Sequence, residues 1–181
     1  SLPSGIEMNT MFRWSSGGID HLLIGSDSGL HHVTLENGLP DMATLTESDL
    51  GPSKHISQLN TGSGDLDLII FGNSSAWTVT LSSSDDGVQL STAVLNDAMS
   101  KILSEAGAQT RDVAHVPMFG RGPLLLVGTD AGLIAWNTTD GSTSIGNPWW
   151  VFNRENAEDF VQRADLLNIS KSAIVNALVK A

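Results

Sequence analysis

Three segments of the chain share one pattern of hydrophobic and polar positions. Each has an apolar run that ends in glycine, then a short polar turn and a second strand-like run, and the segments are 21–35, 66–81 and 123–137. The run-ending glycines are Gly25, Gly72 and Gly128. Their spacings are 47 and 56 residues, in or slightly above the range for propeller blades with four strands each. The pattern therefore predicts a repeated unit made of small β-sheets.

Each repeat gains further strands from its flanking sequence. A strand-like run precedes each segment and is joined to it by a glycine-containing turn, which predicts a hairpin. The expected first strands are 8–16, 55–62 and 112–120, and weaker outer strands are expected near 41–46, 88–95 and 149–153. Together they predict three blades, of about 6–46, 54–95 and 111–153, and the pattern of 172–181 predicts one extra first strand.

Two connections between repeats have helical patterns. Asp97 is the expected N-cap of a helix over 98–106, which Gly107 ends. The face that we expect this helix to bury consists of Met99, Ile102, Leu103 and Ala106. Asn156 is expected to cap a second helix over 157–167 in the same way.

Glycine and leucine positions in two of the repeats match a known family. The matching residues are Gly25, Gly29-Leu30 and Gly38-Leu39-Pro40 in the first repeat, and Gly128-Thr129 and Gly132-Leu133 in the third. On these residues the chain resembles the two-component regulator propeller repeat. It departs from that family at Leu23, Ile70 and Leu126, which replace a tryptophan, and at 73–76, which lacks the Gly-Leu pair. The resemblance implies a propeller fold in an extracytoplasmic sensor region, or in another large surface or secreted protein.

The repeats and the resemblance together predict an all-β fold. We expect a single propeller-type domain over 1–181, a partial propeller of three four-stranded blades plus an extra strand, with two short helical insertions. Three blades do not close a ring, since known rings have roughly four or more. We therefore expect self-association, most simply a homodimer that closes a ring of about six or seven blades, or further blades in a longer chain.

Composition narrows the range of partners and compartments. The formal net charge is −11 with nine Lys and Arg residues, which argues against nucleic acid because that binding depends on clustered cations. We expect no membrane insertion of this segment and no leader before Ser1. Cysteine is absent, which excludes disulfides and thiolate metal sites. The acidic, cysteine-free composition favours an extracytoplasmic location: periplasmic, cell-surface or secreted.

Four residues are candidates for ligand binding. Trp149 and Trp150 are adjacent, and paired indoles stack on sugar rings or anchor a protein partner. The alternative is an outer strand whose two tryptophans cover opposite faces, one of them over the adjacent helix. His31 and His32 are the other two candidates. As neighbours in a strand they point to opposite faces, so they do not ligate one metal.

The remaining polar residues form no recognisable catalytic or metal motif. Asp65, Asp67, Asp85 and Asp86 offer oxygen ligands to calcium if others converge, but solvated acids in turns are the simpler interpretation. Nucleophile-elbow and phosphate-loop motifs are absent from the sequence. We expect no cofactor, no metal and no catalytic residue, and predict a noncatalytic module that binds or senses a small-molecule, carbohydrate or protein ligand. Two alternatives stay open: part of a propeller-fold carbohydrate-active enzyme (glycosidase or lyase), and a purely structural assembly domain.

Overall fold

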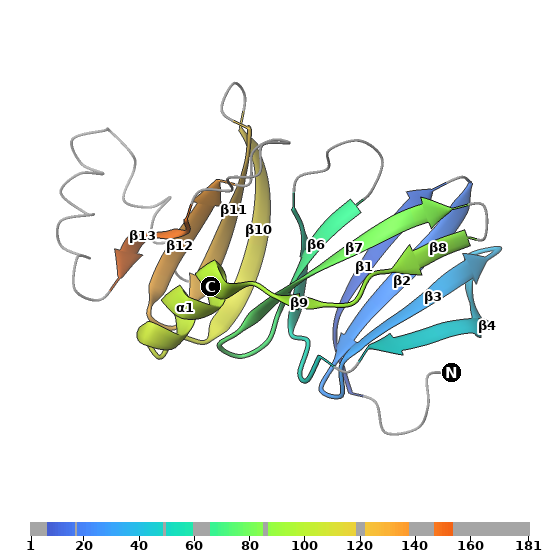
Figure 1. Cartoon of the computed structure of the whole chain (residues 1–181), viewed down its shortest axis with the longest axis horizontal. Helices are drawn as coiled ribbons and strands as arrows, with labels where there is room; N and C mark the ends of the chain where they lie inside the picture. The colour runs from blue at the N-terminus through green and yellow to red at the C-terminus, as the bar shows by residue number, and fades with distance from the viewer. Residues whose placement is uncertain are drawn as a thin grey trace.

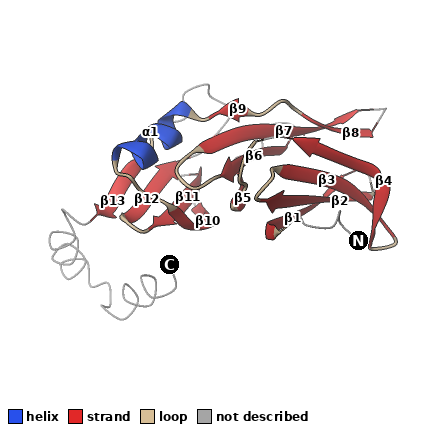
Figure 2. Ribbon diagram, turned by 90° about the horizontal axis from the view of Figure 1, so that it is seen from below, coloured by secondary structure: helices blue, strands red, loops and turns tan. Residues whose placement is uncertain are grey.

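Strands dominate the chain, as the hydrophobic pattern predicts. The computed structural model describes residues 7–16, 18–48, 50–59, 66–84, 87–118, 122–137 and 147–153. These residues contain thirteen β-strands and one α-helix (Figures 1 and 2). The all-β class is therefore confirmed.

The strands form three antiparallel sheets in chain order. The first sheet contains β1 (Met8–Ser16), β2 (Ile19–Ser26), β3 (Leu30–Glu36) and β4 (Leu39–Ser48). The middle sheet contains β5 (His55–Gln58), β6 (Leu66–Phe71), β7 (Ala76–Ser84), β8 (Gly87–Leu90) and β9 (Val94–Leu95). The third sheet contains β10 (Thr110–Met118), β11 (Gly122–Thr129), β12 (Gly132–Asn137) and β13 (Trp149–Asn153). In Figure 1 the middle sheet stands between the other two.

The outer strand of the middle sheet is interrupted, whereas the sequence predicts one strand over 88–95. β8 pairs with the end of β7, and β9 pairs with its start, so both lie along the same edge of β7. Between them, Ser91 Oγ accepts a hydrogen bond from Thr80 N at 2.8 Å. A side-chain oxygen thus replaces a backbone carbonyl of the ladder, and regular pairing stops there.

Strand pairing also corrects the alignment of the middle repeat. Gly25 pairs with Leu30 next to the turn of the first sheet, and Gly128 pairs with Leu133 at the equivalent place in the third. In the middle sheet the corresponding pair is Phe71 with Ala76. Gly72 lies one residue further on, where its N–H donates to Ser75 O at 2.9 Å within the turn. The prediction that Gly72 is equivalent to Gly25 and Gly128 is therefore wrong by one residue, because Gly72 belongs to the turn.

This alignment assigns each sheet two faces. Side chains alternate along a strand, and directly paired residues share a face. We call the face turned towards the next sheet in the chain the forward face, and the opposite one the rear face. Equivalent forward-face residues of the three sheets are Leu23, Ile69 and Leu126. Equivalent rear-face residues are Ile24, Ile70 and Val127.

The forward face of the first sheet packs on the rear face of the middle sheet. The buried cluster between them consists of Leu23 and Leu30 from the first sheet and Leu66, Leu68, Ile70, Val79 and Leu81 from the middle sheet. Phe12 and Trp14 from β1 and Ile56 from β5 pack against this cluster. β1 also contacts β5 directly, so the first strands of the two sheets are neighbours.

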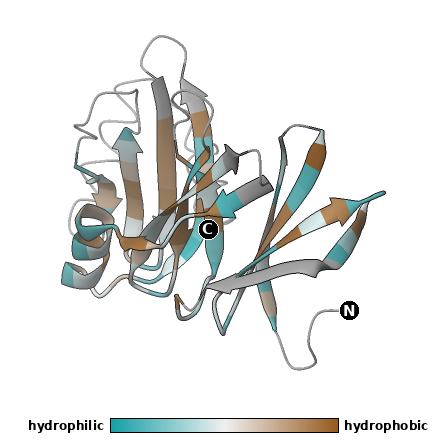
Figure 3. Cartoon of the chain, turned by 45° about the vertical axis from the view of Figure 1, so that its right-hand side comes forward, coloured by the Kyte–Doolittle hydropathy of each residue, from teal (hydrophilic) through white to brown (hydrophobic). Residues whose placement is uncertain are grey.

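The forward face of the middle sheet packs on the rear face of the third sheet. Its cluster includes Ile69, Phe71 and Ala76 from the middle sheet and Leu125, Val127, Ile134 and Trp136 from the third. Helix α1 (Asp97–Glu105) contributes Met99 and Leu103. β5 contacts β10, again joining first strands. Figure 3 shows the hydrophobic residues as brown stretches along the strands of these sheets. One packing arrangement therefore occurs twice, forward face on rear face.

The ends of α1 differ slightly from the sequence prediction. Asn96 is the N-cap, not Asp97, because its side chain accepts a hydrogen bond from Met99 N at 3.1 Å. Ala106 is exposed and forms the C-cap, so it does not belong to the buried face. Gly107 follows with φ 59°, and the helix ends there as predicted.

Several sequence predictions lie outside the described residues. These are the helix capped by Asn156, the extra strand over 172–181, and the calcium alternatives Asp65, Asp85 and Asp86.

Candidate functional site

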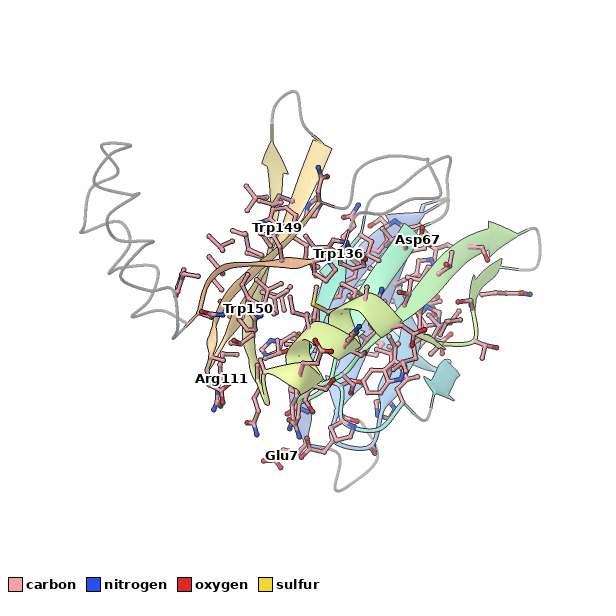
Figure 4. All side chains as sticks on the ribbon, turned by 60° about the vertical axis from the view of Figure 1, so that its left-hand side comes forward. Glu7, Asp67, Arg111, Trp136, Trp149 and Trp150 are labelled. Atoms are coloured by element: carbon pink, nitrogen blue, oxygen red, sulfur yellow. The ribbon has the colours of Figure 1, made fainter. Side chains whose placement is uncertain are left out.

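The two adjacent tryptophans of β13 point to opposite sides of the strand (Figure 4). Trp150 pairs with Ile134 and packs against the cluster that contains α1. Trp149 pairs with Ala135 on the forward face of the third sheet and is 46% exposed. The two indoles therefore do not form one binding surface, and Trp149 is the more exposed of the two.

His31 and His32 are both buried, at 3% and 4% exposure. They lie on opposite faces of β3, as predicted from their adjacency. His31 Nε2 is 2.8 Å from Ser26 Oγ, inside the turn between β2 and β3. His32 lies on the forward face, opposite Leu23. The structure thus places both histidines inside the protein, where a ligand has no direct access.

His32 has a partner that the sequence did not single out. His21 Nδ1 lies 3.2 Å from His32 Nε2, and the two rings stack with centroids 5.4 Å apart. Trp14 flanks His21, also with a centroid distance of 5.4 Å. Burial lowers the pKa of His21, with Asp20 opposing this, and burial together with the neighbouring His21 lowers the pKa of His32. Burial of the pair between the first and middle sheets therefore favours its uncharged form.

Exposed polar residues gather instead where the first strands begin. Lys54, just before β5, forms an ion pair with Asp27 in the turn after β2. Asn9 of β1 donates to Asp27 Oδ1 at 2.9 Å and lies 3.4 Å from Lys54 Nζ. The hydrogen bonds from Lys54 and Asn9 lower the pKa of Asp27. These three residues connect the first and middle sheets at one end of the molecule.

The third sheet has charged residues at the same end. Arg111 of β10 lies 3.6 Å from Asp130, which is in the turn after β11 and also accepts from Gln109 N at 2.8 Å. Figure 4 shows Arg111 and Glu7, the residue just before β1, at one end of the structure. We call this group the polar rim; it consists of Asn9, Asp27, Lys54, Arg111 and Asp130.

The turns that carry Asp27 and Asp130 have the same local structure. Ser26 Oγ and Thr129 Oγ1 each accept hydrogen bonds from the two backbone N–H groups that follow the aspartate. Gly29 and Gly132 both have φ 148°, a conformation that favours glycine. The similar turn sequences 26–29 and 129–132 therefore predict that these two aspartates occupy equivalent positions. Our sequence interpretation assigned them only to turn structure and missed the rim.

His55 lies beside the rim, at the start of β5. Burial lowers its pKa, while the charge of Asp112 and a hydrogen bond that the ring donates to the backbone of Thr110 act in the opposite direction. Thr110 N donates to Asn73 O at 3.0 Å, and Ser53 N donates to Ser26 O at 2.8 Å. These backbone bonds fix each incoming first strand against the turn of the preceding sheet.

The polar rim contains paired charges of both signs. Lys54 faces Asp27, and Arg111 faces Asp130. The surface therefore presents both hydrogen-bond donors and acceptors, with positive and negative charges. Among the described residues, no group of three or more His, Cys, Asp or Glu side chains converges on a possible metal position. Asp67, one of the calcium candidates, accepts a hydrogen bond from Thr80 Oγ1 at 2.6 Å within its own sheet.

Comparisons with known proteins find no match: the chain matches no family model, no curated protein and no solved structure. Within the described part of the chain, none of the helical structure has the length and apolar character needed to cross a membrane.

Proposed function

We propose that this chain is a partial β-propeller that serves as a noncatalytic binding module. The observation that carries the proposal is the repeated arrangement of the three sheets. Forward face packs on rear face twice, and the first strands β1, β5 and β10 are neighbours in order. Radial sheets with adjoining inner strands are the arrangement of propeller blades. The resemblance to the two-component regulator propeller repeat supports the same architecture.

The polar rim is the proposed recognition surface, and a polar segment of another protein is the proposed ligand. The rim lies on strand starts and turns that a rigid sheet framework holds in place, which is where binding residues are commonly found. Its side chains are accessible: Asp27 is 51% exposed and Arg111 is 53% exposed. A peptide presents backbone donors and acceptors as well as charges, which such a mixed surface can pair.

Charge-neutral double variants test the rim. Asp27→Ala with Lys54→Ala, and Arg111→Ala with Asp130→Ala, each remove one acid and one base and leave the net charge unchanged. The matched control is Lys101→Ala with Glu105→Ala, which removes an exposed ion pair of α1. We expect peptides that bind the wild type on a peptide array to bind the control equally and the rim variants at least about tenfold more weakly.

Two results would contradict the proposal. Equal peptide binding by the rim variants would remove the rim from recognition. Turnover of an oligosaccharide mixture by the wild type would favour a glycosidase or lyase instead.

We further propose that the module works outside the cytoplasm and completes a ring by self-association or with further blades. The acidic, cysteine-free composition supports the location. The three-sheet repeat supports the need for further sheets, since roughly four or more close a propeller.

A further inference from the structure

A two-residue turn, Asn37-Gly38, joins β3 to β4. Asn37 has φ 52° and Gly38 has φ 80°. Positive φ at both central residues is the requirement of a type I′ hairpin turn, which Asn-Gly suits well. Glu36 pairs with Leu39 on either side of the turn. Asn37 is also the one residue other than glycine with positive φ among the described residues.

This turn is open to solvent. Both of its residues are exposed, and a Cβ added at Gly38 would meet no atom within 4 Å. Leu39, the first residue of β4, is 70% exposed. β4 is the last strand in the order of the first sheet, and Figure 1 shows it at the edge of that sheet. Water therefore reaches the turn, and its opening disturbs no core residue directly.

The Asn37 side chain has a neighbour that leaves it unusually reactive. A backbone nitrogen that follows an asparagine can attack the side-chain amide, and a Cβ on the following residue hinders that attack. Asn-Gly occurs once in the sequence. By contrast, Asn147 precedes a proline, which has no N–H, and the Asn96 side chain is bound to Met99 N and Thr78 Oγ1.

We propose that Asn37 is a site of spontaneous covalent modification, at which the chain acquires isoaspartate. The nitrogen of Gly38 loses its proton and bonds to Cγ of Asn37. The bond from Cγ to Nδ2 breaks, and Nδ2 leaves with that proton as ammonia. A five-membered succinimide ring remains, and the step needs no oxidant or reductant.

Water then opens the ring in one of two ways. Breaking the bond between the ring nitrogen and Cγ gives aspartate in a normal main chain. Breaking the bond between that nitrogen and the backbone carbonyl carbon gives isoaspartate, whose main chain runs through Cβ and Cγ. Both products carry one negative charge more than asparagine, next to the exposed Glu36.

Isoaspartate changes the hairpin more than aspartate does. Its extra main-chain atom lengthens a turn that has only two residues, and turn geometry sets the register of a hairpin. The pairs nearest the turn are Glu36 with Leu39 and Leu35 with Pro40. We therefore expect isoaspartate to loosen this end of β4, whereas aspartate keeps the turn because Asp-Gly also suits type I′.

Mass spectrometry of tryptic peptides tests the site. Peptide 14–54 contains Asn37 as its one asparagine and lacks glutamine, whereas peptide 55–101 contains three asparagines. After incubation of the folded chain under mildly alkaline conditions, we expect 14–54 to gain about 1 Da and to separate into two products. The gain should be at least about fivefold faster than in 55–101, since no other asparagine precedes glycine.

Two variants serve as controls for the modification and its effect. Asn37→Gly removes the reactive amide and retains the turn, because Gly-Gly suits type I′. Its peptide 14–54 should gain no mass. Asn37→Asp has the charge of the product without the longer main chain. In thermal unfolding, the purified isoaspartate form should have a Tm at least about 2 °C below that of Asn37→Asp.

Three outcomes would overturn the proposal. The first is a folded wild type whose peptide 14–54 gains no mass while the urea-unfolded chain is converted, since the turn would then protect Asn37. The second is a faster gain in 55–101 than in 14–54. The third is an equal Tm for the isoaspartate form and Asn37→Asp, which would remove the effect on the hairpin. None of these measurements depends on peptide binding at the polar rim.

Discussion

The two contacts between sheets follow the same backbone arrangement but are filled differently. Between the first and middle sheets, strand side chains meet directly. Between the middle and third sheets, α1 adds Met99 and Leu103 to the cluster. At the equivalent positions before the turns, the first sheet has Gly25 and the middle sheet has Phe71. The repeat therefore fixes which faces meet, while residue size determines how the space between them is filled.

The backbone around Gly25 explains the small residue there. A Cβ at Gly25 would lie 2.5 Å from Ser53 O and 2.7 Å from Thr10 Cγ2. The segment leading into β5 thus packs directly on the glycine. Phe71 has no such constraint and is fully buried in the cluster with α1. In the middle sheet, the larger residue at this position of the repeat therefore packs in the cluster to which the helical insertion α1 contributes.

The two contacts between sheets also differ in their polar residues. His21 pairs with Thr34 on the forward face of the first sheet, and Asp67 pairs with Thr80 at the equivalent place in the middle sheet. His21 is 1% exposed, whereas Asp67 is only partly buried. The buried Nε2 of His21 has no hydrogen-bond partner among the described residues. Acidification should therefore affect the first contact more than the second.

Phe71→Ala should weaken the contact between the middle and third sheets most strongly. Loss of a buried phenylalanine removes apolar burial and leaves a cavity, at a cost of about 3–5 kcal/mol in the free energy of unfolding. Urea denaturation followed by circular dichroism measures this change. Val94→Ala, at a position 65% exposed on the same sheet, should change the free energy by less than about 0.5 kcal/mol. Equal effects of the two substitutions would contradict the assigned core.

Gly25→Ala should weaken the contact between the first and middle sheets by about 1–3 kcal/mol, the range expected for overpacking. The contact with Ser53 O is with backbone, so relief requires movement of the chain. Gly72→Ala is the comparison, because its Cβ would first meet a Trp77 ring atom at 3.0 Å. The same denaturation experiment should show a smaller loss for Gly72→Ala. The reverse order would mean that the first contact is looser than described.

Lowering the pH should destabilise the first contact through His21 and His32. Both have a pKa below the unfolded value of about 6.5, so the unfolded chain binds more protons below that pH. Their contribution to stability is complete above pH 6.5 and is lost as the pH falls below it. Each histidine reduces the free energy of unfolding by up to about 1.4 kcal/mol per pH unit in that range.

The third sheet supplies a control for this pH dependence. It has Leu124 and Ala135 at the positions of His21 and His32. The double variant His21→Leu with His32→Ala copies those residues and should flatten the slope between pH 6.5 and 5, even if its stability at pH 8 is reduced. An unchanged slope would assign the pH dependence to other groups, of which His55 is the first to test.

Asn96→Ala should have the smallest effect, about 1 kcal/mol, because it removes the N-cap of α1 but no core residue. Asp97→Ala should cost less, since Asp97 is the first helical residue and not the cap. Thermal unfolding distinguishes the two variants. A larger loss from Asp97→Ala would restore the cap assignment made from the sequence.

Much of this fold was predictable from alternation and glycine spacing. β1 and β13 have the bounds expected for their strands, and the opposite orientation of Trp149 and Trp150 follows from their adjacency. The register of the middle sheet was not predictable, because Gly72 has the spacing of the other two glycines but lies in the turn. The cap at Asn96 was missed because Asn and Asp are adjacent and both are good caps.

The candidate site was less predictable than the fold. The sequence suggested aromatic and histidine residues, three of which the structure places in the interior or against the core. Polar rim residues come from three sheets and lie up to about 120 positions apart in sequence, a juxtaposition that local patterns do not reveal. Only the repeated turn aspartates gave a signal, and turn chemistry alone explains such residues equally well.

Thiol labelling at three equivalent positions tests the repeated packing most directly. The chain has no cysteine, so Met11→Cys, Ile56→Cys and Val113→Cys each introduce a single reactive thiol at the same place on the rear face of a different sheet. Forward-on-rear packing predicts rapid labelling for Met11→Cys at high dilution and protection for the other two. Labelling of Ile56→Cys or Val113→Cys as fast as Met11→Cys would contradict forward-on-rear packing.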